Sequence, residues 1–287
     1  IFARMADTRG DALMAEAEKK LNSFSWFGGG SKTEEAAEIY TKAGNAYKVA
    51  KKWEQAGLAF SKAADCQLKL KNTYEAATAL VNAGNVYKKS SAGDAVACLE
   101  QAVQYYAEEG RFNMAARYQK EVAELLEADS MMEDAANAYQ TAADYFEGEG
   151  SVSSANTCLL KVADLSAGLE NYDKAAELFE AVASNSLGNR LLQYSVPEYF
   201  MKASLCTLAS GDVVKARRNL ERYQSLDPNF ARGRECRFLL DVLQALEQLD
   251  LDAFMKALVE YDSVSRVDNW KSSLLLKVKN TLKNEGD

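Results

Sequence analysis

Apolar positions recur at helical spacing along most of the chain. In residues 34–64, Ala37, Tyr40, Ala43 and Tyr47 share one helix face, and a second apolar face follows a short turn. Small side chains let two helix backbones approach closely, and the aromatic rings fill the space that remains. One such hairpin buries only one of its sides, so the pattern predicts that further hairpins stack on it.

Copies of this pattern follow at a step of about 20 residues as far as residue 183. Their first small residues are Ala76, Ala95, Ala115, Ala135, Ala155 and Ala175. Two helices then make a hairpin of about 40 residues, longer than the usual tetratricopeptide (TPR) period of roughly 34. We therefore expect an all-α, TPR-like fold, a right-handed twisted solenoid of antiparallel helical hairpins over residues 7–190.

Beyond residue 190 the regular step is lost and apolar residues become denser, which predicts a C-terminal helical bundle over 191–283. The expected helices are 191–210, 213–226, 230–248, 252–263 and 266–283. Residues 1–6 and 284–287 are expected to be flexible. The segment before Met5 resembles an upstream remnant and is left out of the expected fold.

Several sequence signals predict helix starts. Asp227 is a candidate helix N-cap, and Pro228 after it would take the first helical position. Ser31 and Ser195 each stand three residues before a glutamate, the spacing of a capping box, and Pro197 falls in the first turn after Ser195. No long stretch alternates with period two, so we expect essentially no sheet.

Composition disfavours catalysis. The chain contains no histidine, which removes Ser–His–Asp and Cys–His arrangements and histidine metal ligands. Its five cysteines are widely spaced, and the three glycines at 28–30 are not followed by the Gly-Lys-Ser/Thr sequence of a phosphate loop. A net charge of −8 argues against a nucleic-acid partner. We expect no enzyme activity, no metal and no cofactor.

Three large rings occupy the connector 23–31, where Phe24, Trp26 and Phe27 precede the glycines. A loop seldom buries so much aromatic surface. One interpretation is a hydrophobic plug over the open end of the solenoid. The other is a loop that contacts a membrane, because aromatic side chains favour the bilayer interface and lysines flank the segment. The residues alone leave both interpretations open.

Basic residues gather at the predicted helix ends and turns of the repeats. They are Lys48, Lys51, Lys52, Lys88, Lys89, Arg111, Arg117, Lys120 and Lys161. Any one of them is explained by the preference of cations for helix C-termini. The groups recur about one hairpin apart, so as a set they are expected to line one edge or face and to hold an acidic, elongated partner.

Several segments carry a resemblance to a known family. They are SFSWFGGGSK at 23–32, KVAKKWEQAG at 48–57, NAGNVYKK at 82–89, GRFNMAARY at 110–118, AADYFEGE at 142–149, SSANTCLLKVA at 153–163, LLQYS at 191–195 and EYDSVSRVDNW at 260–270. With these segments the chain resembles the soluble NSF attachment protein (SNAP) family from about residue 7 to residue 283.

The resemblance implies an adaptor in vesicle trafficking and membrane fusion. SNAPs bind the assembled SNARE four-helix bundle, built from syntaxin-type and synaptobrevin-type helices. They recruit NSF, the hexameric AAA+ ATPase called N-ethylmaleimide-sensitive factor, which then disassembles the bundle. The resemblance also implies several copies per SNARE complex and a cytoplasmic protein that is peripheral on the cytosolic face of membranes.

The resemblance assigns residues to three surfaces. The SNARE-binding positions are Lys48, Lys51, Lys88, Lys89, Arg111, Arg117 and Lys161. The membrane-binding positions are Phe24, Trp26 and Phe27, which favours the membrane interpretation of the connector. The ATPase-binding positions are Asp212, Glu247, Asp250 and Asp252. Thr157 replaces a family lysine, and the end at Asp287 lacks the family's penultimate leucine, so binding of the ATPase is expected more firmly than its stimulation.

Two other functions are alternatives to a SNARE adaptor. A generic TPR-like scaffold that clamps an extended peptide would need a groove of lysine and asparagine side chains, and the 40-residue period argues against it. An enzyme of a helical superfamily would need a pocket with convergent titratable groups, and the absence of histidine disfavours that class.

Overall fold

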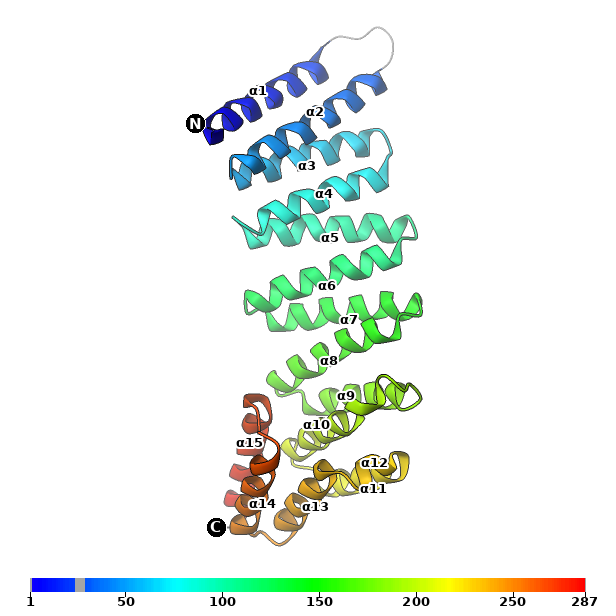
Figure 1. Cartoon of the computed structure of the whole chain (residues 1–287), viewed down its shortest axis with the longest axis vertical. Coiled ribbons are helices and arrows are strands. Elements are labelled where there is room, and N and C mark those ends of the chain that lie inside the picture. Colours follow the sequence, from blue (N-terminus) through cyan, green and yellow to red (C-terminus); the bar gives the residue numbers. More distant parts are fainter. Residues whose placement is uncertain (1, 24–28, 287) are drawn as a thin grey trace. The chain divides into compact units, whose positions relative to one another are not determined.

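The computed structural model describes residues 2–23 and 29–286 of the chain, and over these residues it is helical without any strand (Figure 1). Its elements are α1 (Phe2–Asn22), α2 (Gly29–Val49), α3 (Trp53–Lys69), α4 (Thr73–Tyr87), α5 (Ala92–Glu108), α6 (Phe112–Ala128), α7 (Met132–Gly148), α8 (Val152–Gly168), α9 (Tyr172–Leu187), η1 (Gln193–Ser195), α10 (Val196–Ala209), α11 (Val213–Leu226), α12 (Pro228–Ala231), α13 (Arg234–Glu247), α14 (Leu251–Val264) and α15 (Asn269–Gly286). The expectation of an all-α fold built from helical hairpins is confirmed.

The structure divides into two compact units, residues 1–155 and residues 156–287. The division falls inside α8, whereas the sequence placed a boundary at residue 190. Residues 2–6 and 284–286 lie at the outer ends of α1 and α15, and their expected flexibility stays a prediction. The first helix begins at Phe2 and so includes residues that precede Met5.

The predicted 20-residue step has a simple origin in the turns. Helices of 15 to 17 residues alternate with short turns, and most of these turns contain one residue with positive φ. At Lys51 φ is 59° and at Ser130 it is 63°, while Gly110 takes the same conformation at 67°. The amide of the next residue then bonds back to the helix, as Met131 N does to Leu126 O at 2.9 Å. This is the hydrogen bond of a Schellman cap.

Close helix contacts in the first unit depend on small residues. Ala43, Ala56 and Ala59 are fully buried in a cluster with the ring of Phe60. A Cβ atom on Gly57 would overlap the ring of Tyr87, so only glycine permits this approach. The sequence predicted small residues at the crossing points, and the structure confirms it for this cluster.

The second unit has a denser core, as the leucine-rich composition predicted. Phe200 stacks on Tyr223 at a centroid distance of 4.3 Å and meets Phe230 edge-on at 5.4 Å. Two predicted helices are divided in the structure. Extended backbone at Gly233, with ψ of 160°, separates α12 from α13, and η1 precedes α10.

The predicted caps had mixed outcomes. Asp227 does cap α12, where its Oδ1 accepts a hydrogen bond from the amide of Asn229 at 2.9 Å. Ser195 precedes α10 but its side chain makes no capping hydrogen bond, although Pro197 does fall in the first turn. The capping box at Ser31 was wrong, because α2 already begins at Gly29 and Ser31 lies inside its first turn.

Candidate functional site

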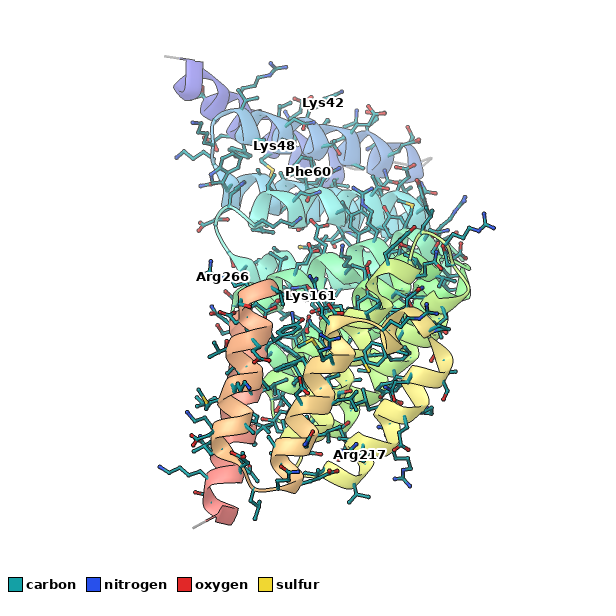
Figure 2. All side chains as sticks on the ribbon, turned by 60° about the horizontal axis from the view of Figure 1, so that its bottom comes forward. Lys42, Lys48, Phe60, Lys161, Arg217 and Arg266 are labelled. Atoms are coloured by element: carbon teal, nitrogen blue, oxygen red, sulfur yellow. The ribbon has the colours of Figure 1, made fainter. Side chains whose placement is uncertain are left out.

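The turns of the first unit lie at two edges. Successive helices from α1 to α7 pack as neighbours and run antiparallel, so their turns alternate between the edges (Figure 1). The α2–α3 turn and the α4–α5 turn share one edge, which we call the lysine edge. It carries Lys48, Lys51, Lys88 and Lys89 (Lys48 is labelled in Figure 2).

Three lysines of the lysine edge are available to a partner. Lys48, Lys51 and Lys89 are exposed, and none of them has an ion-pair partner among the described residues. Lys88 differs, because its side chain is only 21% exposed and pairs with Glu121 of α6. It also donates a hydrogen bond to Asn85 Oδ1 at 2.8 Å. Burial lowers the pKa of Lys88 despite the opposing charge of Glu124, and the neighbouring Lys89 acts in the same direction as burial.

The two predicted arginines of this unit do not extend the lysine edge. Arg111 precedes α6 in the α5–α6 turn, which belongs to the opposite edge. Its guanidinium lies 5.9 Å from the ring centroid of Tyr74, at the start of α4. Arg117 lies within α6, 5.7 Å from the ring centroid of Tyr118. Arg111 therefore lies at the edge opposite the lysine edge, because consecutive turns alternate, and a face shared by all the basic groups stays a prediction.

Lys161 belongs to the second unit. It lies in the middle of α8 and is half-buried. Thr157, which replaces a lysine of the resembled family, lies one helical turn before it in the same helix.

The predicted acidic residues of the second unit gather at one end of its helices. Asp212 caps α11 by accepting a hydrogen bond from Lys215 N at 2.7 Å, and Asp250 caps α14 by accepting one from Ala253 N at 2.9 Å. Asp252 follows in the first turn of α14. Arg217 (labelled in Figure 2) links α11 to α13 at this end, because its Nη2 donates a hydrogen bond to Glu247 Oε2 at 2.8 Å. The acidic end thus comprises Asp212, Glu247, Asp250 and Asp252.

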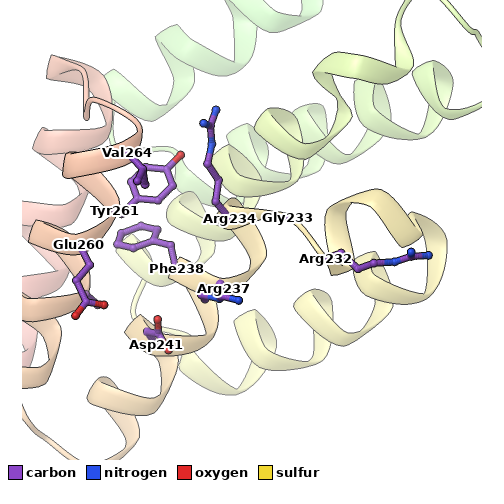
Figure 3. A pocket seen from close by; sticks show the side chains of 10 residues that line it. Arg232, Gly233, Arg234, Arg237, Phe238, Asp241, Glu260, Tyr261 and Val264 are labelled. Carbon is purple, nitrogen blue, oxygen red and sulfur yellow. The ribbon is translucent and has the colours of Figure 1, made fainter.

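A cavity of about 420 Å³ lies between α13 and α14 (Figure 3). Its floor is the stacked pair Phe238 and Tyr261, whose centroids are 4.5 Å apart. The side chains of Arg232 and Arg234 extend away from this floor, so the titratable groups do not converge as they do in a catalytic pocket. No cluster of three metal-binding side chains occurs in the described residues either.

Two further expectations concern membranes. Phe24, Trp26 and Phe27 lie outside the described residues, so their predicted contact with a bilayer stays a prediction. Within the part of the chain that the structure describes, none of the helices combines the length and the apolar character that crossing a bilayer requires.

Comparison with known proteins places the chain in a family. The family model described as "Soluble NSF attachment protein, SNAP" matches residues 8–283. The chain belongs to the SNAP family. Its relatives include the alpha-soluble NSF attachment protein of Dictyostelium discoideum, 46% identical over 97% of this chain and 97% of that protein. The human alpha-soluble NSF attachment protein is 43% identical over 96% of this chain and 95% of that protein. The vesicular-fusion protein SEC17 of Komagataella phaffii is 40% identical over 96% of each chain.

Membership in the SNAP family confirms two expectations from the sequence. The family resemblance is correct over nearly the whole chain, and SNAPs are adaptors rather than enzymes. The relatives' names connect the family with vesicular fusion.

The segment 260–270, one of those that carried the SNAP resemblance, holds the connection between α14 and α15. Asp262 Oδ1 accepts a hydrogen bond from Val267 N at 2.7 Å, and Asp268 Oδ1 accepts one from Lys271 N at 2.8 Å. Trp270 meets Phe179 edge-on at 5.6 Å. These side chains stabilise the connection between the two helices. From the sequence alone, the segment had indicated only the resemblance to the family.

Sequence reasoning did not single out one further basic group of the first unit. Lys69 and Lys71 lie at the α3–α4 turn, on the same edge as Arg111. The signal that could have found them is the alternation itself, because turns that share an edge are about 40 residues apart along this chain.

Proposed function

We propose that this chain binds the assembled SNARE four-helix bundle and brings the hexameric ATPase NSF to it, so that ATP hydrolysis can disassemble the bundle. Membership in the SNAP family supports this function. The observation that carries it is the lysine edge, where Lys48, Lys51 and Lys89 are exposed without ion-pair partners on a chain of net charge −8.

The lysine edge suits an elongated acidic partner better than a compact one. Its lysines come from two turns separated by two helices, so their contacts are spread along a line. Each exposed pair contributes about 0.5 kcal/mol in water, and several such pairs are needed for useful affinity. Lys161 and Arg117 are proposed as additional SNARE contacts, and Lys88 as a weaker one because Glu121 already neutralises it.

The acidic end is the proposed contact for NSF. Asp212 and Asp250 each use one carboxylate oxygen to cap a helix, which fixes the side chain while its other oxygen stays able to accept a hydrogen bond. A carboxylate held in this way loses less side-chain entropy when a basic partner binds. Glu247 is shared with Arg217, so its net contribution is expected to be smaller.

The proposed place of action is the cytosolic face of membranes. Insertion of Phe24, Trp26 and Phe27 into the bilayer interface would concentrate the adaptor near membrane-anchored SNARE complexes. Binding of several copies to one bundle would add avidity without new kinds of contact.

Two matched lysines provide a sharp test of the lysine edge. Lys51 and Lys71 occupy equivalent turns, with φ of 59° and 61°, but lie on opposite edges. Glutamate is tolerated in this conformation, since Glu170 adopts φ of 61°. We expect Lys51→Glu combined with Lys89→Glu to weaken binding to a soluble SNARE four-helix complex about tenfold at low salt, and to reduce the salt dependence of binding. Lys71→Glu should leave both unchanged.

Binding would be measured by co-sedimentation across a salt series. Equal weakening by Lys71→Glu would overturn the assignment to the lysine edge but leave SNARE binding in place. Absence of saturable binding by the unaltered chain at low salt would overturn the SNARE function and favour the peptide-clamping scaffold.

A further inference from the structure

A third surface, which shares no residue with the lysine edge or the acidic end, lies between α14 and α15. It is a groove of about 820 Å³. From α14 it is lined by residues at positions 255, 258, 259 and 262, and from α15 by residues at 272, 275, 276 and 279. Both series have the spacing i, i+3, i+4, i+7, so one continuous ridge of each helix forms a wall.

The walls of the groove are largely apolar and open to solvent. Val259 is 65% exposed and Leu276 is 57% exposed, although both are aliphatic. Met255 and Leu258 are half-buried beside them. Two parallel apolar ridges with a gap between them accept the side chains of a third helix, in the way that helices pack ridges into grooves.

The charges of the groove indicate which kind of helix fits. Arg266 stands at the end near the α14–α15 turn (Figure 2), and Lys279 lies ten residues into α15. Neither has an ion-pair partner among the described residues. The lining carboxylate, Asp262, already accepts the amide of Val267 at 2.7 Å. The groove therefore offers two unpaired cations on a chain whose net charge is −8.

We propose that this groove binds an acidic amphipathic helix of a partner protein other than the SNARE bundle and NSF. Its apolar ridge packs between Leu258 and Leu276, and its carboxylates pair with Arg266 and Lys279. Arg266 lies in the turn before α15, and Lys279 lies ten residues beyond the first residue of α15, which is about 15 Å along the helix axis at a rise of 1.5 Å per residue. We therefore expect the partner helix to carry two acidic residues about ten or eleven positions apart. That spacing is three helical turns, so both residues lie on the face that bears the apolar ridge.

The test uses two synthetic amphipathic 20-residue peptides that differ only at two positions eleven residues apart. One peptide has glutamate at both positions and the other has lysine. The full chain is titrated with each labelled peptide and binding is followed by fluorescence anisotropy. We expect saturable binding of the glutamate peptide and at least tenfold weaker binding of the lysine peptide.

The variant Arg266→Glu with Lys279→Glu should invert this preference, and Leu276→Asp should remove binding of both peptides. Lys256→Glu is the control on the other wall helix, α14, because its side chain is 77% exposed and does not line the groove. It should leave peptide binding unchanged. SNARE binding of all variants, measured in parallel, should equal that of the unaltered chain.

Three results would overturn the proposal. One is no saturable binding of the glutamate peptide, or binding that the double charge reversal leaves unchanged. Another is loss of SNARE binding in the double variant, which would make the groove part of the SNARE surface. The last is binding to phosphatidylserine vesicles, but not to peptide, that requires Arg266 and Lys279, which would assign the groove to a membrane.

Discussion

Replacement of Lys271 by methionine tests how the segment 260–270 stabilises the second unit. The Lys271 side chain is only 8% exposed, and its Nζ lies 2.6 Å from Glu198 Oε1 and 3.2 Å from Asp268 Oδ2. Methionine keeps most of the volume but removes the charge, which leaves two carboxylates without their shared cation.

The expected cost follows from the exposure of these carboxylates. Breaking a fully buried ion pair costs about 3–5 kcal/mol. Glu198 and Asp268 are 38% and 53% exposed, so water replaces part of the lost interaction, and we expect about 2 kcal/mol. For a unit of this size that lowers the Tm by about 6 °C. The control is Lys256→Met, whose exposed pair with Glu260 contributes about 0.3 kcal/mol.

The cost should also depend on pH. Burial alone would raise the pKa of Asp268, but its hydrogen bonds from Lys271 outweigh this and lower it. Its contribution to stability is therefore complete above its unfolded pKa of about 3.9 and is lost as the pH falls through the lower folded value. Burial alone would lower the pKa of Lys271, but the hydrogen bond to Glu198 and its other ionic contacts raise it. That contribution persists at neutral pH and fades only above about pH 10.4.

Differential scanning calorimetry from pH 2 to pH 8 would measure these differences. The gap in Tm between the unaltered chain and the Lys271→Met variant should be widest near neutral pH and narrow below about pH 4. A gap no larger than that of Lys256→Met, or one that stays constant down to pH 2, would refute the reasoning.

Two further predictions concern the connector and the turns. Phe24→Ser with Trp26→Ser should slow disassembly of SNARE complexes on liposomes and spare soluble complexes, and equal activity on both substrates would rule out the membrane contact. In urea denaturation, Ser130→Gly should raise the free energy of unfolding by about 0.5–1 kcal/mol and Gly110→Ala should lower it by about 1 kcal/mol, because both positions have positive φ; effects of the opposite sign would contradict this.

The repeat was predictable from the sequence because the helices of the first unit pack against one another in the same way. Each uses alanine or glycine where backbones cross and one large side chain in the gap, so the spacing of small residues gives the helix step directly. The second unit follows no such rule. Gly233 interrupts what reads as one helix, and only the position of neighbouring helices decides whether a glycine is accommodated or ends the helix.

The geometry of the candidate surfaces could not be predicted from the sequence. Lys89 and Arg111 are close enough in sequence to look like members of one series, yet one helix separates them and places them at opposite edges. The ion pair of Lys88 could not be predicted from the sequence either. Its partner Glu121 lies on another helix, and only the packing of the helices brings the two side chains together. The groove between α14 and α15 requires two ridges side by side, which no single periodicity shows.

The arrangement of the lysine edge bears on how SNARE binding would respond to salt. Neighbouring helices lie about 8–10 Å apart, so two helices separate Lys51 from Lys89 by about 20 Å. That exceeds the Debye length of about 8 Å at physiological ionic strength. The two turns then act as nearly independent charges towards a partner, and their effects on affinity add. The single variants Lys51→Glu and Lys89→Glu should therefore sum to the double variant, whereas strong coupling between them would mean that the partner contacts both turns through one rearranged site.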